Sequence, residues 1–162
     1  MAALPAALLW DVDGTLAETE LEGHRRAFNR AFADAGDPWH WDRSRYLELL
    51  RISGGRERLT AFLQQVEQVV PSPGRVEALQ QAKQHHYRAL VAAGELELRP
   101  GVARLMATAA QAGLVQGIVT TSGRAAVAAL LERLLPERLG ALQLRICGED
   151  VQRKKPHPEA YR

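Results

Sequence analysis

The feature that most constrains this chain is a change in the kind of element that its pattern predicts. One strand-like segment lies near the start at Ala7–Trp10, helical patterns alone fill roughly residues 20–93, and helices then alternate with strands at Leu114–Val119 and Leu142–Ile146. Strand–helix alternation is typical of a parallel sheet, because each crossover helix covers a face of that sheet. The sequence therefore predicts an α/β fold with a parallel sheet and an all-helical block inserted after the first strand.

Apolar residues at helical spacing, ended by glycine and proline, show where the helices are expected. On the longest helix the predicted apolar side includes His86 and Leu90, and Gly113 is expected to close the helix that precedes the second strand. The predicted helices cover residues 24–35, 43–51, 56–69, 75–93, 102–112 and 125–135.

Composition excludes several classes of protein. The 162 residues amount to about one domain, and 46% hydrophobic with 25% charged residues is typical of a soluble globular chain. A net charge of +2 does not by itself indicate nucleic-acid binding, and no apolar run approaches the roughly 18 residues of a membrane span. The single cysteine, Cys147, excludes an internal disulfide and favours a reducing compartment. We expect a cytoplasmic monomer that binds neither nucleic acid nor membrane.

The apolar opening segment, Met1–Trp10, lacks the basic region of a signal peptide and leads directly to Asp11. We therefore expect it to contain a buried strand.

Two carboxylates, Asp11 and Asp13, stand where the first strand ends. Open α/β sheets bind ligands at the carboxyl edge of their strands, where two carboxylates can converge on one cation. An ordinary Asp-Gly turn with incidental acids is the main alternative. A calcium loop is disfavoured, because its sixth position requires glycine and is Leu16 here.

The next two strands end in residues suited to an anion. Thr120–Ser122 supply hydroxyls just before a helix, whose first backbone N–H groups would face the same edge. After the third strand comes Lys155, followed by Pro156, where an ammonium can neutralise a cluster of carboxylate and phosphate. The alternatives are an ordinary helix N-cap for the hydroxyls and a solvated surface pair for Lys154 and Lys155.

Together the three signals resemble the motifs of the haloacid dehalogenase-like phosphohydrolases. Asp11–Leu16 matches the first motif, Thr120 after Gly117–Val119 the second, and Lys155-Pro156 the third. The helical block resembles the helical cap of that family. Closer similarity is to the CbbY-type sugar-phosphate phosphatases, near β-phosphoglucomutase. The segments that carry this closer likeness are residues 17–20, 23–28, 54–58, 99–101 and 154–158.

The resemblance implies a Rossmann-like core of residues 1–18 and 95–162 and a helical cap of residues 19–94. It implies that Asp11 is a nucleophile that forms an aspartyl-phosphate, and that Asp13 is a general acid and then a general base. Thr120 and Lys155 would hold the phosphoryl oxygens. The implied cofactor is Mg²⁺, bound by Asp11 and by the backbone carbonyl of Asp13.

The resemblance also implies substrate contacts. Arg56 follows a loop of small residues, and Lys83 lies four residues before Tyr87, a spacing that the family shares. Packing within a helix is an equal alternative for His24, as is a solvated helical face for Lys83. The substrate-binding candidates are Glu18, His24, Gly54, Gly55, Arg56, Lys83, Thr121 and Ser122.

The family has a fourth motif, an acidic pair that follows the lysine on a later strand. No such pair occurs before Arg162, and the segment from Pro158 resembles the start of a helix. We therefore expect a core that lacks its C-terminal part, and a 162-residue chain that binds Mg²⁺ poorly and hydrolyses little.

Three functions remain open at this stage. The leading hypothesis is an Mg²⁺-dependent phosphatase of small phosphorylated sugars. A pentulose bisphosphate such as xylulose-1,5-bisphosphate is a candidate substrate, because a second basic cap group suits a second phosphate. The alternatives are a phosphosugar mutase of the β-phosphoglucomutase type and an inactive truncated fragment.

Overall fold

The computed structural model describes residues 5–162 and separates into two compact units. The core unit contains the described residues up to Glu18 together with Leu96–Arg162, and the cap unit is Thr19–Glu95. Met1–Leu4, which belong to the predicted core and to the apolar opening segment, lie outside the described residues.

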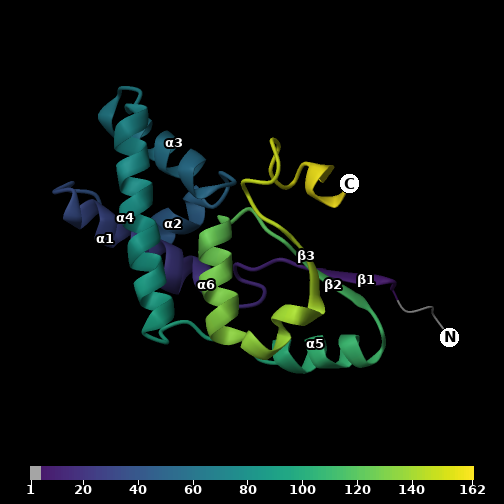
Figure 1. The fold of residues 1–162 in the computed structure, drawn as a ribbon. Helices are drawn as coiled ribbons and strands as arrows, with labels where there is room; N and C mark the ends of the chain where they lie inside the picture. The colour runs from purple at the N-terminus through teal and green to yellow at the C-terminus, as the bar shows by residue number, and fades with distance from the viewer. Residues whose placement is uncertain (1–4) are drawn as a thin grey trace. The chain divides into compact units, whose positions relative to one another are not determined.

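The core unit contains the predicted parallel sheet (Figure 1). Its three strands lie in chain order, and Trp10 at the end of the first pairs with Ile118, while Val119 at the end of the second pairs with Ile146. The loops that follow the strands therefore begin side by side at one edge of the sheet. The elements of this sheet and its helices are β1 (Ala7–Trp10), α5 (Val102–Gln111), β2 (Val115–Val119), α6 (Arg124–Leu134) and β3 (Leu142–Ile146).

The pairing of β2 with β3 contains a bulge. Gln116 pairs with Leu142 but the next residue, Gly117, pairs with Leu144, so Gln143 is one extra residue in β3. From there the register continues unbroken to Val119. The bulge therefore lies upstream of the loop that leaves β3.

The first strand is less buried than the sequence predicts. Leu9 is 44% exposed, and Ala7 is exposed as well. Among the described residues β1 pairs with β2 alone, which makes it an edge strand of this sheet. The expectation of a buried strand is therefore wrong for this structure.

The helices of the core unit follow their apolar spacing. Val127, Leu130 and Leu131 are buried on α6, and Val102 and Met106 are buried on α5. The φ of Gly113 is +73°, in the left-handed region that a closing glycine adopts. The stop predicted after α5 is therefore confirmed.

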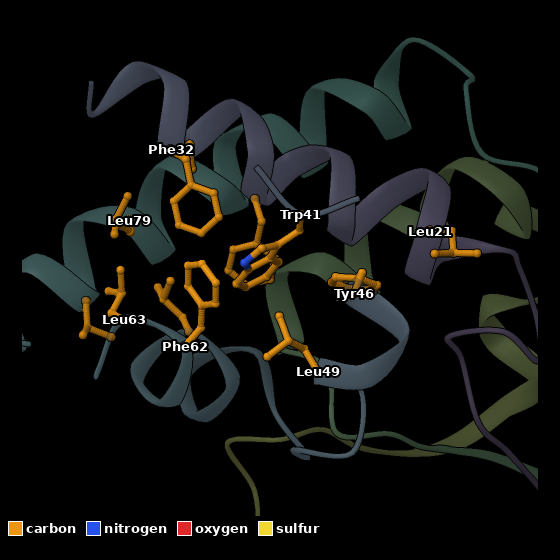
Figure 2. Close-up of a cluster of buried hydrophobic side chains, with 12 residues drawn as sticks. Leu21, Phe32, Trp41, Tyr46, Leu49, Phe62, Leu63 and Leu79 are labelled. Atoms are coloured by element: carbon orange, nitrogen blue, oxygen red, sulfur yellow. The ribbon is translucent and has the colours of Figure 1, made fainter. Parts of the chain in front are cut away.

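The cap unit is built around an aromatic cluster (Figure 2). Trp41 is completely buried, with its ring centroid 4.7 Å from that of Phe28 and 5.1 Å from those of Phe32 and Phe62. Its rings stand edge-on to Phe32 and Phe62, an arrangement that aromatic quadrupoles favour. The side-chain amide of Asn29 accepts from Trp41 N at 2.7 Å and donates to Trp41 O at 2.9 Å, which fixes the loop that carries the indole.

Local signals set the ends of the cap helices. The Asp42 carboxylate accepts from Arg45 N, and Ser72 accepts from Arg75 N with Pro73 as the first helical residue, which are N-cap interactions. The cap helices are a π-helical segment Glu20–Arg25, α1 (Arg26–Asp34), α2 (Arg43–Leu49), α3 (Gly55–Glu67) and α4 (Pro73–Ala92).

Two details differ from the sequence expectation. The first cap helix starts at Glu20 in π-helical form rather than at His24. On α4 the buried positions include Lys83 and Tyr87, whereas His86 is only partly buried and lies 2.5 Å from Asp34. Within residues 5–162, no helix is both long and apolar enough to cross a membrane.

Candidate functional site

The core unit brings Asp11 and Lys155 together across the edge of the sheet. Lys155 Nζ lies 2.7 Å from Asp11 Oδ1 and also donates to the carbonyl of Val119 at 2.9 Å. Both side chains are partly accessible, with 39% of Asp11 and 22% of Lys155 exposed. The ammonium offsets the charge of the Asp11 carboxylate and so lowers the repulsion that an incoming anion would meet. The interpretation of Lys155 as a merely solvated surface lysine is therefore not supported.

A tight turn after β1 fixes the two carboxylates. The carbonyl of Val12 accepts from the backbone N–H of Leu16 at 2.9 Å, and Gly14 N donates to Ala17 O at 2.8 Å. Gly14 has φ +74°, a conformation that a side chain would disfavour. The turn thus holds residues 11 and 13 at the strand end.

Asp13 is joined to the loop that follows β2. The Ser122 hydroxyl donates to Asp13 Oδ2 at 2.5 Å, and Ser122 N donates to Thr120 Oγ1 at 3.1 Å. Thr120 is buried, and its own N–H donates to the carbonyl of Ile146 at 2.9 Å. The structure therefore places Ser122 against the proposed acid–base residue, a contact that sequence reasoning did not predict.

The loop that follows β3 covers the start of α6. Both oxygens of the Glu149 carboxylate accept from Arg124 N, at 3.0 and 3.2 Å, and the Asp150 carboxylate pairs with the Arg124 guanidinium. Gly123 is the N-cap residue and supplies no side-chain cap. The Glu149 carboxylate, from the loop after β3, therefore accepts from the first N–H of α6, and no hydroxyl caps this helix.

Cys147 begins this same loop and is buried. Burial raises the pKa of the Cys147 thiol above its usual value. The thiol is therefore protonated at neutral pH, and it is not a nucleophile of this site.

The donor atoms available here suit Mg²⁺. Asp11 and Asp13 offer hard oxygen atoms, and Mg²⁺ is usually held by one or two carboxylates plus water and substrate phosphate. Within the described residues no group of three or more histidine, cysteine or acidic side chains that could hold a metal is present. The residues present fit a magnesium ion that shares its coordination with phosphate.

In the cap unit, two of the predicted substrate contacts lie beside the same tyrosine. The His24 ring stacks on that of Tyr87 at 4.3 Å, and Lys83 Nζ lies 5.3 Å from the Tyr87 centroid and 5.2 Å from that of Phe28. Both His24 and Lys83 are more than nine-tenths buried. A solvated helical face is therefore not the environment of Lys83, although sequence reasoning allowed it.

The other predicted cap contacts lie in different settings. Gly54, with φ +93°, precedes α3, and a Cβ at Gly55 would make ordinary contact with Phe28 and Gln80. The Arg56 guanidinium is 54% exposed and pairs with Glu77, and this hydrogen bond lowers the pKa of the Glu77 carboxyl. Arg56 is therefore largely exposed, whereas His24 and Lys83 are buried.

Glu18, the remaining candidate, lies in the core unit. Its carboxylate is half exposed and accepts from the Arg99 guanidinium at 2.9 Å. Arg99 N in turn donates to Leu16 O at 2.8 Å, so this pair is tied to the turn after β1.

Sequence reasoning missed Arg58. This guanidinium is buried, stacks 5.3 Å from the Tyr46 ring centroid, donates to the Tyr46 hydroxyl at 3.1 Å and to the carbonyls of Leu49 and Ile52. The Tyr46 hydroxyl in turn donates to the Glu20 carboxylate at 2.7 Å, so Glu20 belongs to the same hydrogen-bond network. Two sequence signals could have pointed to Arg58, namely its place in the segment 54–58 that resembles the family and its helical spacing beside Leu59 and Phe62.

Comparisons with known proteins agree with this architecture. The sequence profile of the haloacid dehalogenase-like hydrolases matches residues 5–162. The chain belongs to this family. It is 44% identical over 158 residues to the protein CbbY of Cereibacter sphaeroides, covering 96% of this chain and 67% of that protein. It is 37% identical to a CBBY-like protein of Arabidopsis thaliana, covering 99% of this chain and 53% of that relative.

Solved structures of CbbY from Rhodobacter sphaeroides share the fold. The structure in complex with phosphate has a TM-score of 0.87 and 41% identity, over 98% of this chain and 70% of that chain. A mutant of the same protein in complex with xylulose-1,5-bisphosphate has a TM-score of 0.87 and 40% identity. This hydrolase-family chain therefore spans between about half and two thirds of the length of the two curated relatives named above.

Proposed function

We propose that the full-length protein is an Mg²⁺-dependent phosphatase of small phosphorylated sugars. The observation that carries the proposal is the contact of Lys155 Nζ with Asp11 Oδ1 at 2.7 Å, with Asp13 on the same turn. Family membership and 44% identity to a CbbY protein support the same reading.

Asp11 is the proposed nucleophile. One carboxylate oxygen forms a bond to phosphorus while the bond from phosphorus to the sugar oxygen breaks, giving an aspartyl-phosphate. Asp11 needs no general base, because a carboxylate oxygen attacks phosphorus without losing a proton. Its own negative charge repels the phosphate, and the Lys155 ammonium offsets that repulsion.

Asp13 is the proposed acid and base. Its carboxyl group gives a proton to the departing sugar alkoxide, then takes one from the water that attacks the aspartyl-phosphate. That attack forms a new bond from water oxygen to phosphorus and returns the bonding electrons to Asp11, releasing inorganic phosphate. The Ser122 hydroxyl, 2.5 Å from Asp13 Oδ2, orients this carboxyl group.

Thr120 and Thr121 stand on the loop that would receive the phosphoryl oxygens, beside Lys155. Asp11 and Asp13 would hold Mg²⁺, and the ion would supply Lewis-acid charge that lowers the electrostatic cost of bringing two anions together.

A bisphosphate of a five-carbon sugar is the proposed substrate class. A CbbY structure, 40% identical to this chain, contains xylulose-1,5-bisphosphate, and the cap unit here keeps a buried ammonium at Lys83 beside His24. A buried cation suits a second phosphate, since charge-assisted bonds are strongest away from water.

The test is a product analysis of the full-length gene product with Mg²⁺ and a panel of sugar mono- and bisphosphates. Release of inorganic phosphate, with a preference for pentulose bisphosphates, is the expected result. Transfer of phosphate between positions of one sugar would replace the proposal with a mutase. Absence of both would contradict enzymatic turnover of this class.

A further inference from the structure

Gly148 lies where the loop after β3 touches the loop after β2. It is buried, and its N–H donates to the carbonyl of Ser122 at 3.0 Å. Two residues earlier in each loop, Thr120 N donates to Ile146 O at 2.9 Å. The backbone of residues 120–122 therefore lies directly against that of residues 146–148.

A side chain at this position has no room. An ideal Cβ on Gly148 would lie 2.4 Å from the carbonyl oxygen of Thr121 and 3.1 Å from its carbonyl carbon. It would also lie 3.5 Å from Lys154 Cε, the carbon bonded to the ammonium nitrogen of the residue next to Lys155. Gly148 is not among the glycines with positive φ, so the requirement comes from close approach and not from backbone conformation.

Two other glycines of the core unit show how the space for a Cβ differs from that at Gly148. At Gly117 an ideal Cβ would lie 2.5 Å from Leu144 Cγ, but that neighbour is a side chain that is 37% exposed and can turn away. At Gly140 nothing lies within 4 Å. Only at Gly148, among these three, is the obstacle a backbone atom of the predicted phosphate loop.

The loop that carries Gly148 is itself fastened. Glu149 accepts from Arg124 N, the Asp150 carboxylate pairs with the Arg124 guanidinium, and Cys147 N donates to Asp150 Oδ2 at 2.8 Å. An added methyl group therefore cannot be absorbed by a free movement of residues 147–150. The displacement falls on Thr120–Ser122.

We propose that Gly148 is a positioning residue, whose missing side chain sets how closely the Thr120–Ser122 loop approaches the phosphoryl group. The inference rests on the proposed function in one respect, namely that this loop binds phosphate. The inference extends the proposed function by naming a residue of the neighbouring loop, and this residue touches no substrate. A displaced loop changes the direction of the Thr120 and Thr121 donors and of the Ser122 hydroxyl that holds Asp13.

The experiment compares G148A with G140A and G117A in the full-length protein with Mg²⁺. The affinity for inorganic phosphate is measured by calorimetric titration well below the melting temperature of every variant, because reversible unfolding would raise the apparent Kd. For G148A we expect a Kd raised about tenfold and a kcat/KM lowered on the order of a hundredfold, the penalty of a misplaced catalytic group. G140A should match the wild type in both.

G117A separates positioning from loss of stability. We expect G117A to lower the melting temperature while leaving the phosphate Kd within about twofold of wild type, as for a substitution outside the binding loop. An unchanged Kd in G148A, or an equal rise in G117A, would overturn the proposal. A wild type that binds phosphate but releases none from sugar phosphates would end the proposed function and leave this inference standing.

A second variant covers the case in which G148A does not fold. E149A removes the carboxylate that fastens the loop to Arg124 but adds no atoms. We expect a Kd for phosphate raised by a few-fold, and if G148A is unfolded an unchanged Kd in E149A contradicts the proposal.

Discussion

The two units place their functional candidates in opposite ways. In the core unit the contacts join loops far apart in sequence: Lys155 to Asp11 across 144 positions and Ser122 to Asp13 across 109. In the cap unit the polar candidates His24 and Lys83 lie inside a helical core, against aromatic rings. Core candidates thus depend on strand register, whereas cap candidates depend on packing.

The difference also appears in composition. All aromatic residues except Trp10 and Tyr161 belong to the cap unit, where five of them surround one another as Phe28, Phe32, Trp41, Tyr46 and Phe62. Aromatic burial supplies much of the stability of a small helical unit, and it leaves that unit able to hold buried cations. Each unit should therefore respond differently to substitution.

The largest expected effect is on the core nucleophile. Asp11→Asn should lower turnover of the full-length protein by at least about 10⁴-fold, because an amide cannot form the aspartyl-phosphate. Steady-state phosphate release measures it. Asp42→Asn makes the same chemical change at a helix N-cap, where asparagine caps as well as aspartate, and should leave both activity and melting temperature near wild type. Retained turnover in Asp11→Asn would remove this residue from the mechanism.

In the cap unit, the test concerns the side chain at the centre of the aromatic cluster. Trp41→Ala should reduce the free energy of unfolding by about 3–5 kcal/mol, since a fully buried indole leaves a cavity. Leu47→Ala, at a residue that is 49% exposed, should change the free energy of unfolding by no more than about 0.5 kcal/mol. Urea unfolding monitored by circular dichroism gives both values. Equal losses in the two variants would mean that the aromatic cluster does not stabilise the cap unit.

The third test returns to the core. Lys155→Met should lower kcat about 10²- to 10³-fold, the usual cost of losing a charged group that stabilises the transition state. Its neighbour provides the control, and Lys154→Met should lower kcat less than about tenfold, as for a charge without direct contact to the nucleophile. A reversed order of the two effects would exchange their roles.

The fourth test separates binding from chemistry in the cap. Lys83→Met should raise KM for a bisphosphate about tenfold with little change in kcat, the pattern of lost uniform binding. The free energy of unfolding of this variant is measured as well, because methionine also removes the cation–π contacts of Lys83 with Phe28 and Tyr87. Arg56→Met, at an exposed side chain, should have a smaller effect on KM. A lower melting temperature with unchanged KM would make Lys83 structural.

The smallest effect is on the surface of the cap. The Arg56 hydrogen bond lowers the pKa of Glu77 below its ordinary value of 4.5, so ionised Glu77 stabilises the folded cap above that pH. As the pH falls through the lowered pKa, the carboxyl is protonated in both states and the contribution disappears. Melting temperatures of wild type and Glu77→Gln should therefore differ slightly at pH 7 and converge as the pH falls below the lowered pKa of Glu77.

Sequence reasoning predicted the sheet and the loops at its edge because those signals are local. Strand periodicity followed by Asp-x-Asp-Gly, by hydroxyls and by Lys-Pro identifies three strand ends, and parallel pairing brings them to one edge. The contacts that the other residues of these loops make were not predictable. Whether Ser122 faces a substrate or Asp13, and whether Glu149 caps α6, depends on the path of loops that no periodic pattern describes.

The cap shows a second limit. Helical spacing predicted the helices, yet it assigned His86 to the apolar side of α4 and left Lys83 undecided. The two positions are three residues apart and differ by a small rotation of the helix. Which of them is buried depends on the neighbours Phe28 and Tyr87, whose packing is a property of the assembled cap unit.

The bulge in β3 gives one exposed residue an importance that its side chain does not explain. Gln143 is the extra residue between the partners of Gln116 and Gly117, and a strand advances about 3.3 Å per residue. Because Gln143 is left unpaired, Val119 pairs with Ile146, whereas a regular ladder continued from the pair of Gln116 and Leu142 would bring Val119 opposite Arg145. Replacing the amide of Gln143 would alter little, whereas deleting the residue would leave every pair of the ladder in place and remove the local bend and twist that a bulge adds. The extra residue therefore affects the direction in which β3 leads into the loop of Gly148, and not which residues of the two strands pair.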